Sequence, residues 1–273
     1  MNTPETGPEG MAVHHRGIVM PWECDDMGHL NIRFHAARYG QALGHFASVG
    51  THPHRWTERI ADRFVFFKEA RVGARLVCSL DVPPCLTAAP AISGCLWDMS
   101  TGDILTRIET RLGLAAAQTS RAPSDALSWT NEAMDREWTS AMGMFTPPVD
   151  CRFGMAERIT GVVSDANALA VLELSGGSDY RMTDSPIGFV VAEMNIVYGA
   201  AVTGDAAAFS TKTALLGHSR RSLTFQHRIV TPREATEIAV VRSICVFFDR
   251  RSRQAAPIPF DIRNAPLGVV SSR

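Results

Sequence analysis

The feature that constrains the fold most is the succession of one amphipathic helix and four strands, which occurs twice in the 273 residues. In the first half, apolar side chains recur every three to four positions over residues 32–49, which predicts a helix with one buried face. Apolar and alternating runs predict a strand before this helix and four strands after it, at 14–22, 63–72, 75–82, 92–99 and 104–115.

The second half repeats this order. Strands are expected at 188–205, 207–217, 222–231 and 237–251. We expect the second central helix at 164–174, with Ser164 or Asp165 as its cap, and a connecting amphipathic helix at 124–143. The repetition predicts a duplicated domain of the α+β class. The first domain is expected at 12–118 and the second at 149–263, joined by a linker with the connecting helix at 119–148. A lead at 1–11 precedes them, and a tail at 264–273 follows them.

Composition limits the class of function. The net charge of −1 gives no sign of a nucleic-acid partner or of a membrane surface as partner, and 45% hydrophobic residues suffice for a core. Residues 1–12 lack the basic and apolar regions of a secretory signal, and no apolar run approaches the roughly 18–20 residues of a membrane span. The 6 cysteines form no CxxC pair, so we expect free thiols in a cytoplasmic protein.

The segment PWECDDMGHLNI, between the first strand and the first helix, concentrates polar side chains. They are Glu23, Asp25, Asp26, His29 and Asn31. A structural interpretation is that these residues cap the free N–H groups of the helix and complement its dipole. Asn31 fits the N-cap position, and Gly50 fits the C-terminal stop. Asp26 is assigned to capping or to solvent.

A catalytic interpretation uses the same position. The N-terminus of a helix offers unpaired N–H groups that can stabilise an oxyanion on an attacked carbonyl. A neighbouring carboxylate such as Asp25 can attack that carbonyl or take a proton from water. Gly28 lets the chain turn and lets a substrate approach the backbone, and His29 could orient the carboxylate or the water.

The motif D-x-x-G-H-x-N, formed by Asp25, Gly28, His29 and Asn31, resembles the signature of hot-dog-fold acyl-CoA thioesterases of the 4-hydroxybenzoyl-CoA thioesterase type. In the second half, AEMNIVYGAAVTGD resembles the second strand and Gly-Asp turn of that family, and VFFDRRSRQAAPIP resembles its C-terminal strand. The resemblance covers residues 12–263. It implies antiparallel sheets that each wrap around a central helix, as two tandem hot-dog domains that form an internal pseudo-dimer.

The resemblance also implies a reaction, the hydrolysis of acyl-CoA or acyl-carrier thioesters. No cofactor is implied, since CoA is part of the substrate. Asp25 would act as general base or nucleophile, and the backbone N–H near Ile32, with Gly28, would polarise the carbonyl. His29 and Asn31 would position water, Asp25 or the loop.

Outside this motif, Arg220 and Arg221 could meet the phosphates of CoA, because Arg pairs well with phosphate oxygens. The alternative is that they form an exposed strand end. The acidic residues Glu69 and Glu193 are interpreted as ordinary strand-face charges, and Cys24 as a buried thiol. No metal is expected, because the spacing around Asp25 and His29 matches no standard zinc signature.

The second half lacks the motif, since Arg152 falls where the counterpart of Asp25 would be. We therefore expect one working site and one degenerate half. Two other functions stay open. A hot-dog hydratase or dehydratase acting on enoyl- or hydroxyacyl thioesters would place Asp and His one residue further apart, and a non-catalytic acyl-thioester-binding protein would not need Asp25. The sequence also leaves open a homo-oligomer of double hot-dog chains.

Overall fold

The computed structural model describes residues 10–25, 27–49, 59–82, 91–112, 140–142, 151–175, 185–199, 209–231 and 236–262. The chain divides into two units, and each is described by itself. The first unit comprises residues 1–120 and 147–160, and the second comprises residues 121–146 and 161–273. None of the helices in the described part of the chain is both long and apolar enough to cross a membrane.

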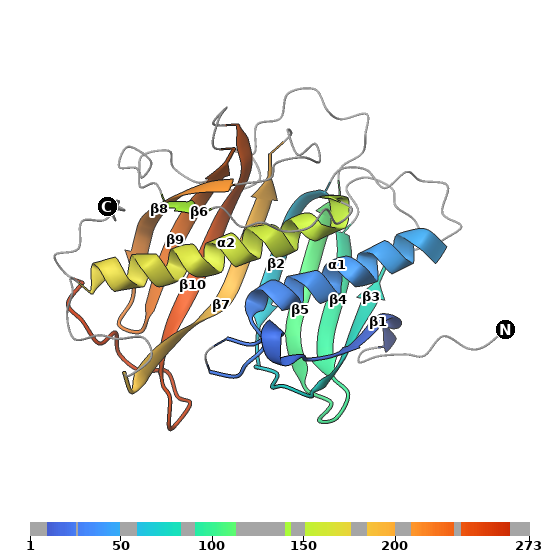
Figure 1. The fold of residues 1–273 in the computed structure, drawn as a ribbon, viewed down its shortest axis with the longest axis horizontal. Coiled ribbons are helices and arrows are strands. Elements are labelled where there is room, and N and C mark those ends of the chain that lie inside the picture. The colour runs from blue at the N-terminus through green and yellow to red at the C-terminus, as the bar shows by residue number, and fades with distance from the viewer. Residues whose placement is uncertain are drawn as a thin grey trace. The chain divides into compact units, whose positions relative to one another are not determined.

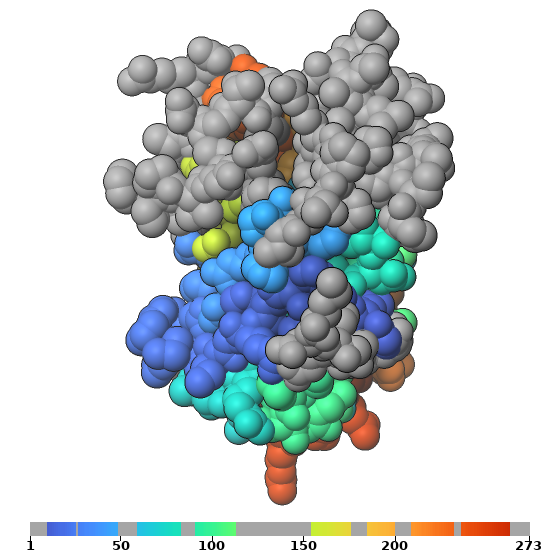
Figure 2. Space-filling model, turned by 90° about the vertical axis from the view of Figure 1, so that its right-hand side faces the viewer, coloured from blue at the N-terminus to red at the C-terminus, as the bar shows by residue number. Residues whose placement is uncertain are grey.

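The first unit is an antiparallel sheet with a long helix on one face (Figure 1). Its elements are β1 (Ala12–Ile18), α1 (Ile32–Val49), β2 (Arg59–Phe66), β3 (Arg75–Asp81), β4 (Ala91–Asp98) and β5 (Ile104–Leu112). The strand order is β1-β3-β4-β5-β2. Helix α1 packs against β1, β3 and β4, and α1 and β1 form adjacent blue areas of the surface in Figure 2. The helix expected at 32–49 is confirmed.

The strands of the second unit pair in the same order as those of the first unit. Its strands are β6 (Ser140–Met142), β7 (Ile187–Tyr198), β8 (Phe209–His218), β9 (Ser222–Val230) and β10 (Glu237–Asp249). They pair antiparallel in the order β6-β8-β9-β10-β7, so each strand takes the place that the strand five numbers lower takes in the first unit. Helix α2 (Cys151–Leu174) begins in the first unit and belongs to the second from Gly161 onward.

The start of the second central helix was expected in the wrong place. Helix α2 begins at Cys151, so Ser164 and Asp165 lie inside it and cap nothing at its start. The buried face extends backward at three-to-four spacing through Met155, Ala156, Ile159, Val162, Val163 and Ala166. Arg152 is likewise helical, and not part of a loop equivalent to that of Asp25. Of the connecting helix expected at 124–143, the described residues are 140–142, and they form strand β6.

Tyr39 links α1 to the sheet of the first unit through a buried polar chain. Its hydroxyl donates to Thr110 Oγ1 at 2.8 Å, and the Thr110 hydroxyl donates to Asp62 Oδ1 at 2.6 Å. Arg59 Nε donates to the same Asp62 oxygen at 3.0 Å. Burial raises the pKa of Tyr39, which therefore stays a hydrogen-bond donor. The helix is thus attached to β5 and β2 by hydrogen bonds as well as by apolar contacts.

The Tyr39 ring also requires glycine at position 94 of β4. A Cβ atom placed on Gly94 would lie 2.4 Å from Tyr39 Cε2. We expect Gly94→Ala to lower the free energy of unfolding by about 1–3 kcal/mol, because the ring and its hydrogen bonds must move. The matched control is Gly217→Ala in β8, where no atom lies within 4 Å of the added Cβ. Equal urea midpoints for Gly94→Ala and the wild type would contradict this packing.

Each unit contains a fully buried histidine whose ring is hydrogen-bonded and neutral. His35 Nδ1 lies 2.6 Å from Thr106 Oγ1, and burial lowers the pKa of His35 from 6.5 to about 4, against a smaller opposing effect of the Leu30 backbone. His227 Nδ1 lies 2.9 Å from Thr213 Oγ1, and burial lowers the pKa of His227 from 6.5 to about 3. Protonating either ring in the folded state is unfavourable, so acid favours the unfolded chain.

We therefore expect stability to fall as the pH drops through the ordinary histidine range. Below pH 6.5 these histidines bind protons in the unfolded chain but stay neutral in the folded protein. The free energy of unfolding therefore decreases with falling pH until the pH reaches the pKa of the histidine in the folded protein. The loss at pH 5 should be about 2 kcal/mol per histidine. Urea unfolding at pH 7.5 and pH 5 measures it, and His35→Gln should reduce the loss. A free energy of unfolding that does not change between these pH values would contradict the expectation.

Candidate active site

The loop at residues 19–31 carries the D-x-x-G-H-x-N motif, and backbone hydrogen bonds hold both of its ends to residues 70–74. At its start, Val19 N donates to Ala74 O at 3.0 Å, and a short 3-10 helix, η2 (Pro21–Glu23), follows. At its end, Leu30 N donates to Ala70 O at 2.8 Å. The loop is therefore a fixed part of the first unit.

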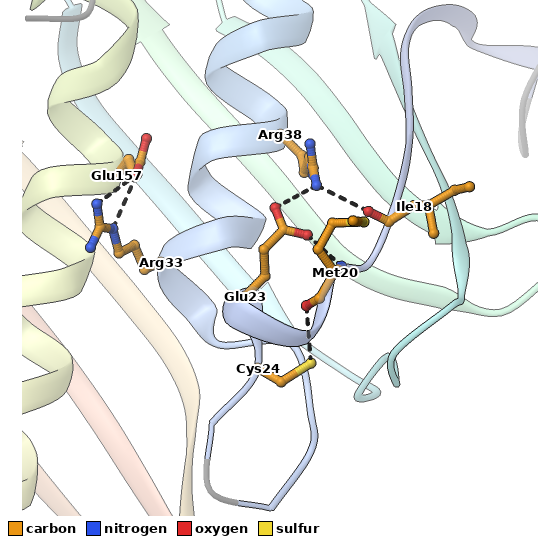
Figure 3. Close-up of polar contacts among 7 residues, drawn as sticks. All are labelled: Ile18, Met20, Glu23, Cys24, Arg33, Arg38 and Glu157. Atoms are coloured by element: carbon orange, nitrogen blue, oxygen red, sulfur yellow. Dashed lines mark hydrogen bonds and ion pairs between the residues drawn. The ribbon is translucent and has the colours of Figure 1, made fainter. Parts of the chain in front are cut away.

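Glu23 is the anchor of this loop (Figure 3). Its buried carboxylate accepts a hydrogen bond from Met20 N at 2.9 Å and pairs with Arg38 of α1 at 2.5 Å. The same Arg38 nitrogen lies 3.3 Å from the carbonyl oxygen of Ile18, and Asn31 N donates to the backbone oxygen of Glu23 at 2.9 Å. The Glu23–Arg38 pair thus ties the end of β1, the loop and the start of α1 together.

A second ion pair lies at the first turn of α1. Arg33 Nε and a terminal nitrogen of Arg33 each lie 3.0 Å from Glu157 Oε1 in the first turns of α2 (Figure 3). Both side chains are partly exposed. The pair neutralises a cation that would otherwise add to the positive end of the α1 dipole.

Asp25 uses one carboxylate oxygen to shape the turn. Asp25 Oδ1 accepts hydrogen bonds from Met27 N at 2.9 Å and from His29 N at 3.0 Å. Gly28 has a φ of 74°, a conformation that suits glycine, and its N–H donates to Asp25 O at 3.0 Å. Asp25 is exposed, and its Oδ2 has no hydrogen-bond partner among the residues that the structure describes. The capping role is therefore present, and it leaves one oxygen open.

The N-terminus of α1 offers a single open N–H group. Asn31 Oδ1 accepts from Arg33 N at 2.9 Å, and Phe34 N donates to Asn31 O at 2.9 Å, which confirms Asn31 as the N-cap. The Ile32 N–H between them has no acceptor in the described part of the chain. The loop thus presents an open carboxylate oxygen at Asp25 and an open backbone donor at Ile32.

His29 is buried and turned toward a carboxylate that the sequence analysis did not connect with it. His29 Nδ1 lies 3.4 Å from Glu69 Oε2. Glu69 follows the end of β2 at Phe66, so it lies in a connection and not on the strand face. The backbone places the two residues together, because His29 forms a bridge with Arg71. No sequence spacing indicated this pairing.

The remaining candidates lie elsewhere or lack reactivity. Arg220 and Arg221 are exposed in the turn between β8 and β9. This turn belongs to the second unit, whereas the Asp25 loop belongs to the first. Cys24 Sγ lies 3.7 Å from Met20 O, and desolvation, followed by the charges of Asp25 and Glu23, raises the pKa of the thiol. A thiol with a raised pKa is a poor nucleophile. Asp26 and Gly50 lie outside the described residues.

The family model for the Thioesterase-like superfamily matches residues 150–265. No curated protein matches the chain. Among solved structures, the chain is similar to the 12:0-ACP thioesterase from Umbellularia californica, with a TM-score of 0.55 and 13% identity over 85% of this chain and 92% of that one. The chain has a hot-dog fold. The resemblance of the sequence to hot-dog thioesterases is confirmed by this fold and by the family match over residues 150–265.

Two further structures share the fold of this chain. A conserved protein with a hot dog fold from Alicyclobacillus acidocaldarius has a TM-score of 0.56 and 12% identity over 86% of this chain and 95% of that one. The dehydratase domain of PpsC from Mycobacterium tuberculosis, in complex with C12:1-CoA, has a TM-score of 0.53 and 11% identity over 90% and 97%. The family match covers α2 and β7–β10, whereas the Asp25 loop lies outside it.

The Glu23–Arg38 pair can be tested by removing one charge or both. Both side chains are largely buried, at 8% and 13% exposed. We expect Glu23→Gln to lower the free energy of unfolding by about 3 kcal/mol, because it leaves Arg38 buried without a counter-charge. The double variant Glu23→Leu/Arg38→Leu should recover most of that loss. If the double variant is as unstable as the sum of the two single variants in urea, the pair does not anchor the loop.

Proposed function

We propose that the protein is an acyl-CoA thioesterase, which hydrolyses an acyl thioester to a free carboxylic acid and CoA. The observation that carries this proposal is the pair of open groups on one loop, Asp25 Oδ2 and the Ile32 N–H. The thioesterase-like family match and the hot-dog fold support the same class of reaction.

In the proposed reaction, the thioester carbonyl oxygen accepts a hydrogen bond from the Ile32 N–H. The positive end of the α1 dipole then stabilises the negative charge that develops on this oxygen. Asp25 Oδ2 takes a proton from a water molecule while the water oxygen bonds to the carbonyl carbon. The C–S bond breaks, the carboxylic acid forms, and the CoA thiolate leaves and takes up the proton.

A nucleophilic role for Asp25 is the second route to the same products. Its carboxylate would attack the carbonyl carbon, expel the CoA thiolate and form a mixed anhydride, which water then hydrolyses. In both routes Asn31 and His29 are positioning residues. Asn31 occupies the neighbouring N–H of Arg33 while the Ile32 N–H stays open, and His29, held beside Glu69, supports the turn that carries Asp25.

We also propose that the two units are tandem hot-dog domains that form an internal pseudo-dimer. Their identical strand order supports a duplication. The second half lacks the D-x-x-G-H-x-N motif, so we assign one working site to the chain and binding surface to the other half. Arg220 and Arg221 are the proposed contacts to the substrate's phosphates.

The fold by itself does not separate a thioesterase from a dehydratase, because the PpsC dehydratase domain shares it. The side chains favour hydrolysis. In a dehydratase, His29 would have to transfer a proton to or from the substrate. The His29 side chain, however, is buried and faces Glu69. A purely binding role would give no reason for an open carboxylate oxygen at Asp25 and an open N–H at Ile32.

Asp25→Asn tests the proposed role without removing the turn. Asn keeps the Oδ1 acceptor for Met27 N and His29 N, but it cannot act as a base or a carboxylate nucleophile. We expect thiol release from acyl-CoA to fall by about a hundredfold or more, while the urea midpoint stays close to that of the wild type. The assay uses a panel of short, long, branched and aromatic acyl-CoAs.

The matched comparison is Asp26→Asn, which changes the neighbouring aspartate and should retain activity. If Asp25→Asn and the wild type release thiol at the same rate, Asp25 is not the catalytic carboxylate. If the wild type releases no thiol from any acyl-CoA in the panel but converts an enoyl thioester, the dehydratase function replaces the proposal.

A further inference from the structure

Five arginines of the second unit gather at the turn between β8 and β9 and the turn after β10. They are Arg220, Arg221, Arg250, Arg251 and Arg253, and we call them the arginine patch. The segments are in contact, since Phe247 N donates to Arg221 O at 2.8 Å and Ile258 N donates to Arg220 O at 3.0 Å. In Figure 1 the red segment after β10 runs beside the turn between β8 and β9.

The turn that presents Arg220 and Arg221 is held by its own serines. Ser219 Oγ accepts hydrogen bonds from Arg221 N at 3.1 Å and from Ser222 N at 3.0 Å. Ser219 N donates to Ser222 O at 2.8 Å. The backbone that carries both guanidinium groups is therefore fixed, which limits the ordering that binding would require.

The turn after β10 presents its arginines in a similarly fixed way. Asp249 Oδ1 accepts from Arg251 N at 3.0 Å and from Ser252 N at 2.6 Å. The Arg253 guanidinium lies 4.7 Å from the centre of the Phe248 ring, and Arg250 lies over Gly188 of β7. The carboxylate of Asp249 is thus occupied by backbone N–H groups of its own turn.

The charge of the patch is not balanced locally. Residues 218–222 and 249–262 contain the five arginines and two aspartates, Asp249 and Asp261. Arg220, Arg221 and Arg251 are exposed, and the described residues provide no acceptor for their guanidinium groups. Five arginines on two adjoining fixed turns, with Arg220 and Arg221 exposed, suit a ligand with several phosphate groups, because guanidinium binds phosphate oxygens in a bidentate manner.

We infer that the arginine patch is a phosphate-binding site for the nucleotide end of CoA. The inference rests on the proposed function for the identity of the ligand. It goes beyond Arg220 and Arg221, because the fold brings the turn that carries Arg250, Arg251 and Arg253 against the turn that carries these two arginines. The 3′-phosphate and the diphosphate of CoA supply the separate anionic groups that such a patch can engage.

Calorimetric titration of the full chain with CoA and with dephospho-CoA tests the inference without turnover. We expect the wild type to bind CoA about tenfold or more tightly than dephospho-CoA, which lacks the 3′-phosphate. The variant Arg220→Ala/Arg221→Ala/Arg251→Ala should bind CoA at least about tenfold more weakly and should lose most of that preference. The matched control is Arg63→Ala/Arg107→Ala/Arg111→Ala, which removes three exposed arginines from strands of the first unit and should retain the affinity.

Unchanged CoA affinity in the patch variant would overturn the site, and so would an equal loss in the control variant, which would indicate general electrostatic attraction. Equal binding of CoA and dephospho-CoA by the wild type would overturn the role of the 3′-phosphate. The proposed function fails separately. If the protein binds CoA through the patch but releases no thiol from acyl-CoA, the phosphate-binding site stands and the thioesterase function is wrong. If the patch variant hydrolyses acyl-CoA with an unchanged KM, the thioesterase function stands and the phosphate-binding site is wrong.

Discussion

The buried ion pair between Glu23 and Arg38 is the interaction on which the candidate site depends. Through its carboxylate Glu23 holds α1 and the start of the loop, and through its backbone oxygen it holds Asn31, the N-cap of α1. A buried carboxylate is tolerated only with such partners. Glu23 and its partners therefore position both the Asp25 turn and the first N–H groups of α1.

Among the described groups of this loop and the start of α1, Asp25 Oδ2 and the Ile32 N–H stay open, and the proposed chemistry needs both. Asp25 gives one oxygen to the turn and keeps the other open, while Asn31 occupies the Arg33 N–H and the Ile32 N–H stays open. A donor and an acceptor fixed in place require little reorganisation when a thioester carbonyl and a water molecule arrive. Such preorganisation is the usual source of large electrostatic effects in catalysis.

Local patterns predicted much of this structure. The period of apolar residues located α1, and alternation located the strands on either side of it, because both signals depend on residues close in sequence. The start of α2 was missed, because Ser164 and Asp165 look like caps and only packing shows that they lie mid-helix. The His29–Glu69 and Glu23–Arg38 contacts join residues with no characteristic spacing, so they required the fold.

The most direct test of the proposed site is a crystal structure with an acyl-CoA analogue in which a methylene group replaces the thioester sulfur. Such a ketone keeps the carbonyl and cannot be hydrolysed. We expect the ketone oxygen at about 3 Å from the Ile32 nitrogen, with the Asp25 carboxylate beside the carbonyl carbon. An analogue bound with its carbonyl away from Ile32, and with Asp25 facing only solvent, would contradict it.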